Sequence, residues 1–391
     1  MSASTRRRTG FIPFLRAHAA SKPMPAAVVV DVGWVNGLAA IRSLGRAGAP
    51  VIALDHHRSP LGFHSRYACP LPCPDPVADE DGFVELLARV GDALGRPAPI
   101  FPTHDPPLNA IARNREALGE RFLCPFPSWQ TLERIQRKRF QLERAEEAGV
   151  PVPLTTHPAT ATEALAAGAG LGYPILVKPS DPVEFKRRFR RQAFRCESPA
   201  ELDRAYADAE PFAPMVQELI PGGDDELYTL GSYLSGDGEA LALFSGRKLR
   251  QTPAGVGTCR VGEAVWVDEV VELGLRLLRA LEFHGVSQVE FKRDPRDGRY
   301  KLMEVNPRLW QWHGLAAACG VDIPRIAYWD LLGARLPPAR MNGAGKRWAI
   351  TLWSGHGVAL QWPPYVDAVF AADDPEPALH QAARVVRGAL R

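Results

Sequence analysis

One stretch constrains this chain more than any other, the segment GVSQVEFKRDPRDGRYKLMEVNPR at residues 285–308. Two short apolar runs, Val286–Phe291 and Tyr300–Val305, flank a centre made of turn-forming residues. This pattern predicts a β-hairpin with a slightly long loop. Glu290 lies late in the first run and Glu304 late in the second, so strand pairing would bring the two carboxylates together.

The residues that follow Glu304 favour chemistry over a solvated hairpin. Asn306 and Arg308 come at alternate positions, so the three side chains project on the same side of an extended chain, which packing does not require. Two carboxylates and an amide oxygen are hard ligands that suit Mg²⁺ bound together with substrate phosphates. Arg308 adds a bidentate donor for a phosphate or a carboxylate beside the metal.

Other cationic residues stand beside predicted strands. Lys178 ends the apolar strand YPILVK, and a lysine on a mostly buried strand costs desolvation free energy unless it meets an anion. Arg247, Lys248 and Arg250 precede a glycine-rich loop at 252–258, which suits an acid substrate or a γ-phosphate. A surface turn is the competing interpretation of this loop.

Two places in the chain are suited to small ligands. A strand at 214–220 breaks at Pro-Gly-Gly, and such a hinge offers backbone groups between apolar walls to a nucleotide base. Residues 26–55 predict a parallel βαβ unit, but GWVNG departs from the dinucleotide fingerprint, so a structural role is favoured. His104 and Asp105 follow a predicted strand at 100–103, where open sheets place ligands, although a satisfied loop pair is the favoured interpretation.

These motifs resemble those of the ATP-grasp ligases, and they arrive in that family's order. VEFK followed by MEVNPR is similar to the metal-binding end of the superfamily, and the chain most resembles its carboxylate–amine ligases, the group of D-aspartate ligase. The resemblance covers residues 28–335. It implies an α/β, ATP-grasp fold with an N-terminal Rossmann-like pre-ATP-grasp domain, a small α+β lid domain and a larger α+β domain, with ATP between the last two.

The resemblance and the composition together divide the chain into five parts. We expect a disordered basic tail at 1–25, the Rossmann-like domain at 26–127, a linker helix and the lid at 128–214, the large subdomain with the metal site at 215–335, and a C-terminal extension at 336–391.

The resemblance also implies roles for individual residues. Lys138 and Lys178 would hold the ATP phosphates, Glu218 and the Ile220 backbone would meet adenine, and Glu226 or alternatively Asp225 would bind the ribose. Glu290, Glu304 and Asn306 would hold Mg²⁺, Arg308 would stabilise an acyl phosphate, and Arg247 or Lys248 would face the acid substrate. The remaining expected substrate contacts are Arg250, His104, Trp312 and His313, with core packing as the alternative for a tryptophan.

The implied activity is that of an ATP-dependent carbon–nitrogen ligase. It would join a small carboxylic acid to an amine, both of them amino acids by analogy, through an acyl phosphate, releasing ADP and phosphate. Two alternatives stay open: an ATP-grasp enzyme with a non-amine acceptor, such as a carboxylase, and a nucleotide- or RNA-binding protein without turnover. The RNA alternative rests on the basic, aromatic strip at 185–195, which is otherwise an arginine lid or a solvated strand with its aromatic residues turned inward.

Composition sets outer limits. The 391 residues suffice for two or three packed units, and a net charge of +3 gives no overall field for nucleic acid or membrane. No apolar run approaches the roughly 20 residues of a membrane helix. Six scattered cysteines suggest reduced thiols in a cytoplasmic protein. The identity of the acid and amine, and the choice between monomer and homodimer, are not predicted.

Overall fold

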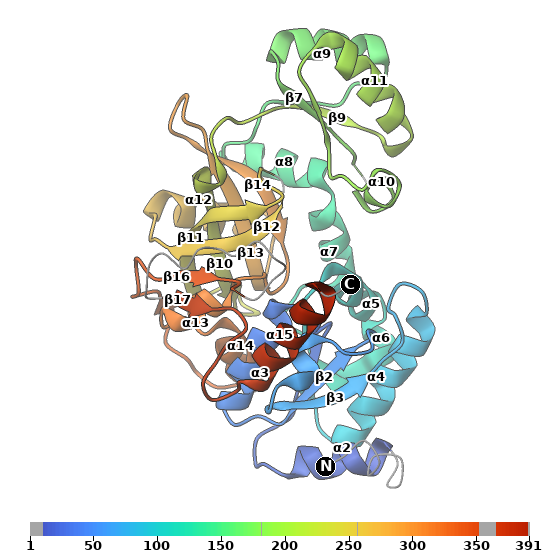
Figure 1. The fold of residues 1–391 in the computed structure, drawn as a ribbon, viewed down its shortest axis with the longest axis vertical. Coiled ribbons are helices and arrows are strands. Elements are labelled where there is room, and N and C mark those ends of the chain that lie inside the picture. The colour runs from blue at the N-terminus through green and yellow to red at the C-terminus, as the bar shows by residue number, and fades with distance from the viewer. Residues whose placement is uncertain (1–10, 181, 256, 352–364, 390–391) are drawn as a thin grey trace.

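The computed structural model of the chain describes residues 11–180, 182–255, 257–351 and 365–389. Three sheets form three units, so the three-part α/β architecture expected from the sequence is confirmed. In Figure 1 the N-terminal unit lies at the bottom, the large sheet unit lies beside and above it, and the small unit stands at the top, reached through α7 and α8. Among the described helices, none combines the length and the apolar character needed to cross a bilayer.

The N-terminal unit is a parallel sheet in the order β3-β2-β1-β4-β5. Its strands are β1 (Ala27–Val30), β2 (Val51–Asp55), β3 (Ala68–Pro72), β4 (Ala98–Pro102) and β5 (Phe122–Leu123), and its helices include α3 (Val35–Arg46), α4 (Glu80–Leu94), α5 (Asp105–Arg113) and α6 (Arg115–Leu118). The chain leaves β1 toward β2 and leaves β4 toward β5, so the strand order reverses between β1 and β4. Open parallel sheets bind ligands at the carboxyl ends of the strands at such a point.

The expectation of a disordered tail over 1–25 is wrong for its second half. Residues 1–10 lie outside the described residues, but α2 (Phe11–Ala20) is a helix packed against α4. Leu15 is fully buried, and Ile12 and Ala19 pack against the same core cluster. The spacing of these three residues places them on one helical face, an apolar pattern that the flanking arginines obscured.

The small unit is an antiparallel sheet in the order β6-β9-β7-β8 with two helices, α9 and α11, beside it (Figure 1). Its elements are β6 (Thr155–Thr156), α9 (Ala161–Leu171), β7 (Ile175–Lys178), α10 (Pro182–Phe189), β8 (Phe194–Cys196), α11 (Pro199–Ala209) and β9 (Met215–Glu218). The basic strip is therefore a helix followed by a short strand. Phe185 is buried and its ring lies 4.8 Å from that of Phe189 and 5.1 Å from that of Phe194. The aromatic residues turn inward, and the described arginines of the strip point outward.

The single linker helix expected from the sequence breaks in two. α7 (Trp129–Gln136) and α8 (Lys138–Glu147) are separated by Arg137, whose backbone is extended. The buried side chain of Gln141 donates to the carbonyl of Ile135 at 2.6 Å and accepts from the backbone N–H of Val305 at 3.1 Å. These bonds fasten the break to the large sheet, and Lys138 becomes the first residue of α8.

The large unit is a sheet in the order β14-β13-β10-β11-β12-β16-β17, with β15 paired to β11. Its elements are β10 (Leu227–Leu234), β11 (Ala240–Thr252), β12 (Thr258–Ala264), α12 (Asp268–Ala280), β13 (Gly285–Arg293), β14 (Tyr300–Asn306), α13 (Gly314–Ala318), α14 (Ile323–Leu331), β15 (Ala339–Arg340), β16 (Arg347–Ala349), β17 (Tyr365–Asp367) and α15 (Glu376–Ala389). The glycine-rich loop is the turn between the paired strands β11 and β12, and β12 was not expected from the sequence.

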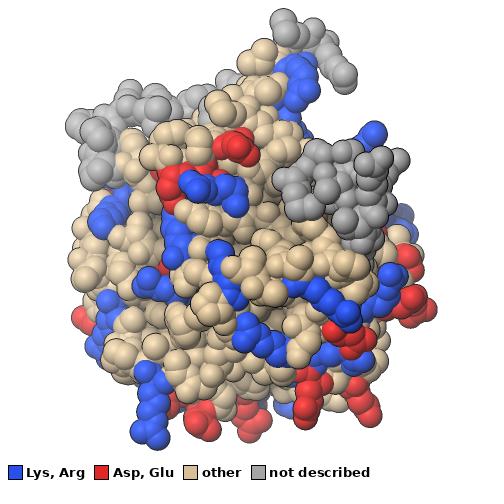
Figure 2. All heavy atoms as spheres, turned by 90° about the horizontal axis from the view of Figure 1, so that it is seen from below, with Lys and Arg blue, Asp and Glu red and all other residues tan. Residues whose placement is uncertain are grey.

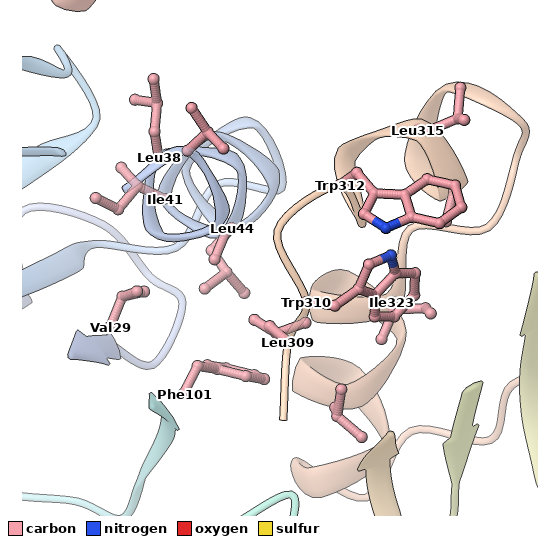
Figure 3. Close-up of a cluster of buried hydrophobic side chains, with 14 of the residues drawn as sticks. Val29, Leu38, Ile41, Leu44, Phe101, Leu309, Trp310, Trp312, Leu315 and Ile323 are labelled. Atoms are coloured by element: carbon pink, nitrogen blue, oxygen red, sulfur yellow. The ribbon is translucent and has the colours of Figure 1, made fainter. Parts of the chain in front are cut away.

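One core joins the N-terminal unit to the large unit. Figure 3 shows α3, which carries Leu38, Ile41 and Leu44, beside the segment that carries Trp310 and Trp312, and all five residues belong to one buried cluster. Both indoles are buried against glycines of the large sheet. A Cβ at Gly231 would lie 2.0 Å from Trp310, and one at Gly262 would lie 2.7 Å from Trp312. These contacts leave no space for any other residue type at either glycine.

The C-terminal extension is part of the fold. β15, β16 and β17 continue the large sheet, and the segment before α15 returns to the N-terminal unit. Asp374 is fully buried and its carboxylate accepts from Arg42 at 2.9 Å, from Ser65 at 2.8 Å and from the backbone of Arg66 at 2.8 Å.

Figure 2 shows the face seen from below, where basic and acidic side chains are interspersed without a field of one sign.

Candidate active site

The predicted hairpin forms from β13 and β14. The strands are antiparallel, and Glu290 is the register partner of Glu304, as Gln288 is of Asn306. A bulge after Glu290 inserts one residue into β14, which turns the strand ends beyond it. Glu290, Glu304 and Asn306, the three proposed metal ligands, therefore lie on one face of the sheet.

A lysine from β11 meets this face. The ammonium of Lys248 lies 2.9 Å from Oε1 of Glu290 and 3.1 Å from Oε2, and both residues are buried. Gln288 donates to Glu290 at 2.8 Å, and Asn306 donates to Glu304 at 3.0 Å. Sequence reasoning missed Gln288, although a glutamine inside an apolar strand is a signal, because a buried amide must find partners.

Two more lysines arrive from the linker and the small unit. Lys138 Nζ of α8 lies 3.8 Å from Glu304 Oε2, and Lys178 at the end of β7 donates to Gln217 Oε1 at 2.6 Å. Burial, then the charge of Lys138, lowers the pKa of Lys178 to about 7, against the opposing charge of Glu304. We give the name hairpin cluster to six residues: Glu290, Glu304, Asn306, Lys248, Lys138 and Lys178. They come from the linker, the small unit and the large unit.

The two carboxylates of the hairpin cluster are not equivalent. Burial raises the pKa of Glu290, and the neighbouring charge of Glu304 raises it further against the effect of Lys248. Burial also works to raise the pKa of Glu304, but Lys138 and the hydrogen bond from Asn306 outweigh it and bring that pKa below its ordinary value. A dication between the two would relieve their competition for a proton, and their donor set fits Mg²⁺.

Arg308 connects this face to the N-terminal unit. Its guanidinium donates to Asp105 at 2.7 Å and 3.3 Å and to the amide oxygen of Asn306 at 3.4 Å. Asp105 begins α5, directly after His104, whose Nδ1 lies 3.1 Å from Asp31 Oδ2 at the end of β1. The carboxyl ends of β1 and β4, where the strand order reverses, are thus adjacent to the arginine of the hairpin.

The proposed adenine hinge carries a second group of charges. Glu218 accepts from Lys301 at 2.8 Å and from Arg296 at 2.5 Å, and Asp294 accepts from Lys301 at 2.9 Å and Arg296 at 2.5 Å. We call Glu218, Asp294, Arg296 and Lys301 the hinge cluster. Because both oxygens of Glu218 are engaged, the carboxylate does not face an open base site. Sequence reasoning missed the other three members, which lie on the hairpin and its turn.

The rest of the hinge is held by side chains. The carbonyl of Ile220 accepts from Lys292 at 2.9 Å, and that of Gly222 accepts from the same ammonium at 3.0 Å. Glu226 lies 3.7 Å from Arg293, whereas Asp225 is exposed. Their neighbour Asp224 accepts from the backbone N–H groups of Gln251 and Gly255, tying the β11–β12 turn to the hinge.

Four expected residues do not reach the hairpin cluster. Arg247 alternates with Lys248 along β11, points to the opposite face and pairs with Glu263 at 2.8 Å. Arg250 is exposed. Trp312 packs in the core, and His313 is buried with Nε2 at 3.0 Å from the carbonyl of Asn36, which contradicts a substrate contact for either. Apolar neighbours of α3 and the large sheet enclose both.

Comparisons with known proteins agree with this geometry. A model of the ATP-binding domain of the carbamoyl-phosphate synthase L chain matches residues 266–337. D-aspartate ligase of Enterococcus faecium (strain Aus0004) is 27% identical over 259 residues, 63% of this chain and 61% of that ligase, so the match spans about three fifths of the relative.

Two solved structures illustrate the similarity of fold. Biotin carboxylase of Campylobacter jejuni, solved as a β-γ-ATP complex, superimposes with a TM-score of 0.64 at 17% identity, covering 80% of this chain and 72% of that one. L-amino acid ligase of Bacillus licheniformis superimposes with a TM-score of 0.58 at 17% identity, covering 78% and 74%.

The parallel N-terminal sheet, the small four-stranded unit and the large sheet with its acidic hairpin make up the ATP-grasp fold. The resemblance to ATP-grasp ligases drawn from its motifs is confirmed. Within that superfamily its sequence is similar to D-aspartate ligase, one of the carboxylate–amine ligases.

Proposed function

We propose that the protein is an ATP-dependent carboxylate–amine ligase that forms an amide or peptide bond through an acyl phosphate. The observation that carries this proposal is the hairpin cluster, in which three lysines surround two facing carboxylates. The similarity to D-aspartate ligase supports an acid and an amine, both amino acids, as the substrate class.

The lysines are suited to ATP phosphates. Lys178 has its ammonium in a site that disfavours its charge, with Gln217 as its hydrogen-bond partner, and a polyphosphate would supply the missing anion. Lys138 lies on the other side of Glu304, at the start of α8. Adenine would lie against the Glu218–Ile220 backbone, and Glu226 is the proposed ribose contact, with Asp225 as the alternative.

Glu290, Glu304 and Asn306 would hold Mg²⁺, which when bound neutralises phosphate charge during transfer. Arg308 is oriented by Asp105 and by Asn306, and it would hold the carboxylate that attacks the γ-phosphorus and then the acyl phosphate. Lys248 would offset the repulsion between the acid and the γ-phosphate, a role for which Arg247 lies on the wrong face. His104 is a proposed contact to the second substrate.

A pairwise screen of amino acids and small acids with Mg-ATP, read as ADP release, tests the proposal. Hydroxylamine in place of the amine should give a hydroxamate of the acid. Release of AMP and pyrophosphate would refute an acyl phosphate, because an acyl adenylate requires attack at the α-phosphorus. ADP release that depends on bicarbonate, without an amine, would identify a carboxylase instead, and salt-sensitive RNA binding without ADP would identify the non-enzymatic alternative.

A further inference from the structure

A second group of ligand-type side chains lies at the carboxyl end of β2, apart from the hairpin. Asp55, His56 and His57 each offer a ligand atom, and these atoms all lie within 4.8 Å of one another. The chain bends directly after Asp55, so the two imidazoles do not alternate as they would along a strand. Their ring centroids are 3.9 Å apart.

The carboxylate of Asp55 is half satisfied. Oδ1 accepts from the backbone N–H of His57 at 2.8 Å and lies 2.9 Å from His57 Nδ1. Oδ2 has no hydrogen-bond partner, although the residue is fully buried. A buried carboxylate oxygen without a partner costs free energy that a bound cation would recover. The ideal Cβ position of Gly33 lies 3.3 Å from Oδ2, so a side chain there would press on this oxygen.

The surroundings are acidic. His56 Nε2 lies 3.9 Å from Asp75 Oδ2, and Asp31 at the end of β1 feels the charges of both His56 and His57. An anionic phosphate would be repelled by three carboxylates at this edge of the sheet. A cation is favoured, and imidazole nitrogens distinguish a transition metal from Mg²⁺ or Ca²⁺, which prefer oxygen.

We propose that Asp55, His56 and His57 form a binding site for a divalent transition metal of the zinc class. Zinc-class metals bind imidazole nitrogen and carboxylate oxygen at about 2.0–2.2 Å, and ligand atoms within 4.8 Å of one another can share one ion once the side chains rotate. Three protein ligands leave a fourth tetrahedral position open to water or to another ligand. The site is separate from the proposed Mg²⁺ ligands on the hairpin, and it does not depend on ligase activity.

The test uses the full chain after chelator treatment and Co²⁺ as the probe. Titration should give one equivalent of the visible absorption that tetrahedral Co²⁺ shows, and Zn²⁺ should displace it. His56→Ala and His57→Ala should each weaken Co²⁺ binding at least about 10-fold. Glu304→Gln should leave the Co²⁺ titration unchanged.

His64→Ala is the matched control, because His64 lies on the same segment but stacks on His380 at 3.6 Å between ring centroids. It should bind Co²⁺ as the unaltered chain does. Circular dichroism confirms that each variant is folded before titration. Absence of stoichiometric Co²⁺ absorption in the unaltered chain, or its persistence in the His56→Ala/His57→Ala double variant, overturns the proposal.

Discussion

The two ends of the same hairpin carry two charge clusters that differ in how completely their charges are paired. In the hinge cluster, Lys301 and Arg296 each contact both Glu218 and Asp294, at 2.5–2.9 Å. In the hairpin cluster two carboxylates face each other, and Lys138 stays 3.8 Å from the nearer one. The first cluster pairs all of its charges at hydrogen-bond distance, whereas the second pairs Glu290 with Lys248 in this way and leaves Lys138 at 3.8 Å from Glu304.

The pKa values show the same contrast. Hydrogen bonds from Arg296 first, and from Lys301, lower the pKa of Asp294, so the hinge cluster favours its charged state. In the hairpin cluster burial raises the pKa of Glu290 and lowers that of Lys178, so the charges of these two groups are disfavoured, whereas the pKa of Glu304 is lowered. Removing one member of a closed ion network leaves a buried charge without a partner, whereas an open network is available to ligands that bring charge of their own.

The largest expected effect is on catalysis. Glu304→Gln should lower kcat/KM at least about 1,000-fold, more than the loss of one oxyanion donor, because it removes a proposed metal ligand. Its thermal transition should stay within a few degrees, and Glu239→Gln on the surface is the matched control. Full activity in the purified variant would remove Glu304 from the site.

The next effect is on stability. Lys301→Met should lower the free energy of unfolding by about 3 kcal/mol, because it leaves Glu218 and Asp294 buried without their shared lysine. Urea denaturation measures it. Since the folded pKa of Asp294 is lowered, the stability that it contributes is present above its ordinary pKa and is lost as pH falls below about 4. Lys301→Met should lose less free energy of unfolding in that pH range than the unaltered chain does. An equal loss in acid would mean that the hinge cluster is not a closed network.

A smaller effect concerns ATP affinity and its dependence on pH. With a pKa of about 7, Lys178 is largely neutral at pH 8 and must take up a proton to meet phosphate. ATP affinity should therefore fall as pH rises above 7, by up to about 10-fold per unit. Lys178→Arg should flatten this profile, since arginine stays charged. Lys178→Ala should weaken ATP more than the acid, and calorimetry in two buffers would reveal the proton uptake.

The smallest effect is the most discriminating for the acid substrate. Arg247→Ala should change the KM for the acid less than about 5-fold, because it disrupts a part-exposed pair with Glu263 on the far face of the sheet. Lys248→Met should raise that KM well beyond this range while the KM for ATP changes less. If Arg247→Ala raised the KM for the acid more than Lys248→Met did, the face of the sheet assigned from the strand register would not determine where the acid binds.

The local motifs predicted the hairpin because its signal is contained in 24 consecutive residues, from a strand pattern to a turn. The assignment of Lys138 and Lys178 to the same ATP phosphates came from family resemblance, since no local pattern links the two segments. Lys301 and Arg296 could not be assigned to Glu218, because these bonds span 83 and 78 residues. Long-range pairing is a property of the packed chain.

The residues around α3 show a second limit. Trp312 and His313 stand close to Arg308 in sequence, and proximity suggested a shared role. The chain turns after Arg308, so the arginine stays at the sheet face and the next residues enter the core (Figure 3). Conversely, α2 and the break at Arg137 depend on contacts with α4 and β14 that helical periodicity does not encode.

The bond between Arg42 and Asp374 has a consequence for synthesis of the chain. Its two partners are 332 residues apart, and both are buried. Domains fold as they leave the ribosome, N-terminal ones first. The N-terminal sheet therefore emerges long before the carboxylate that completes it, and until then Arg42 must keep its charge in water. The N-terminal unit therefore reaches its full set of buried contacts only after the segment that carries Asp374 has been translated.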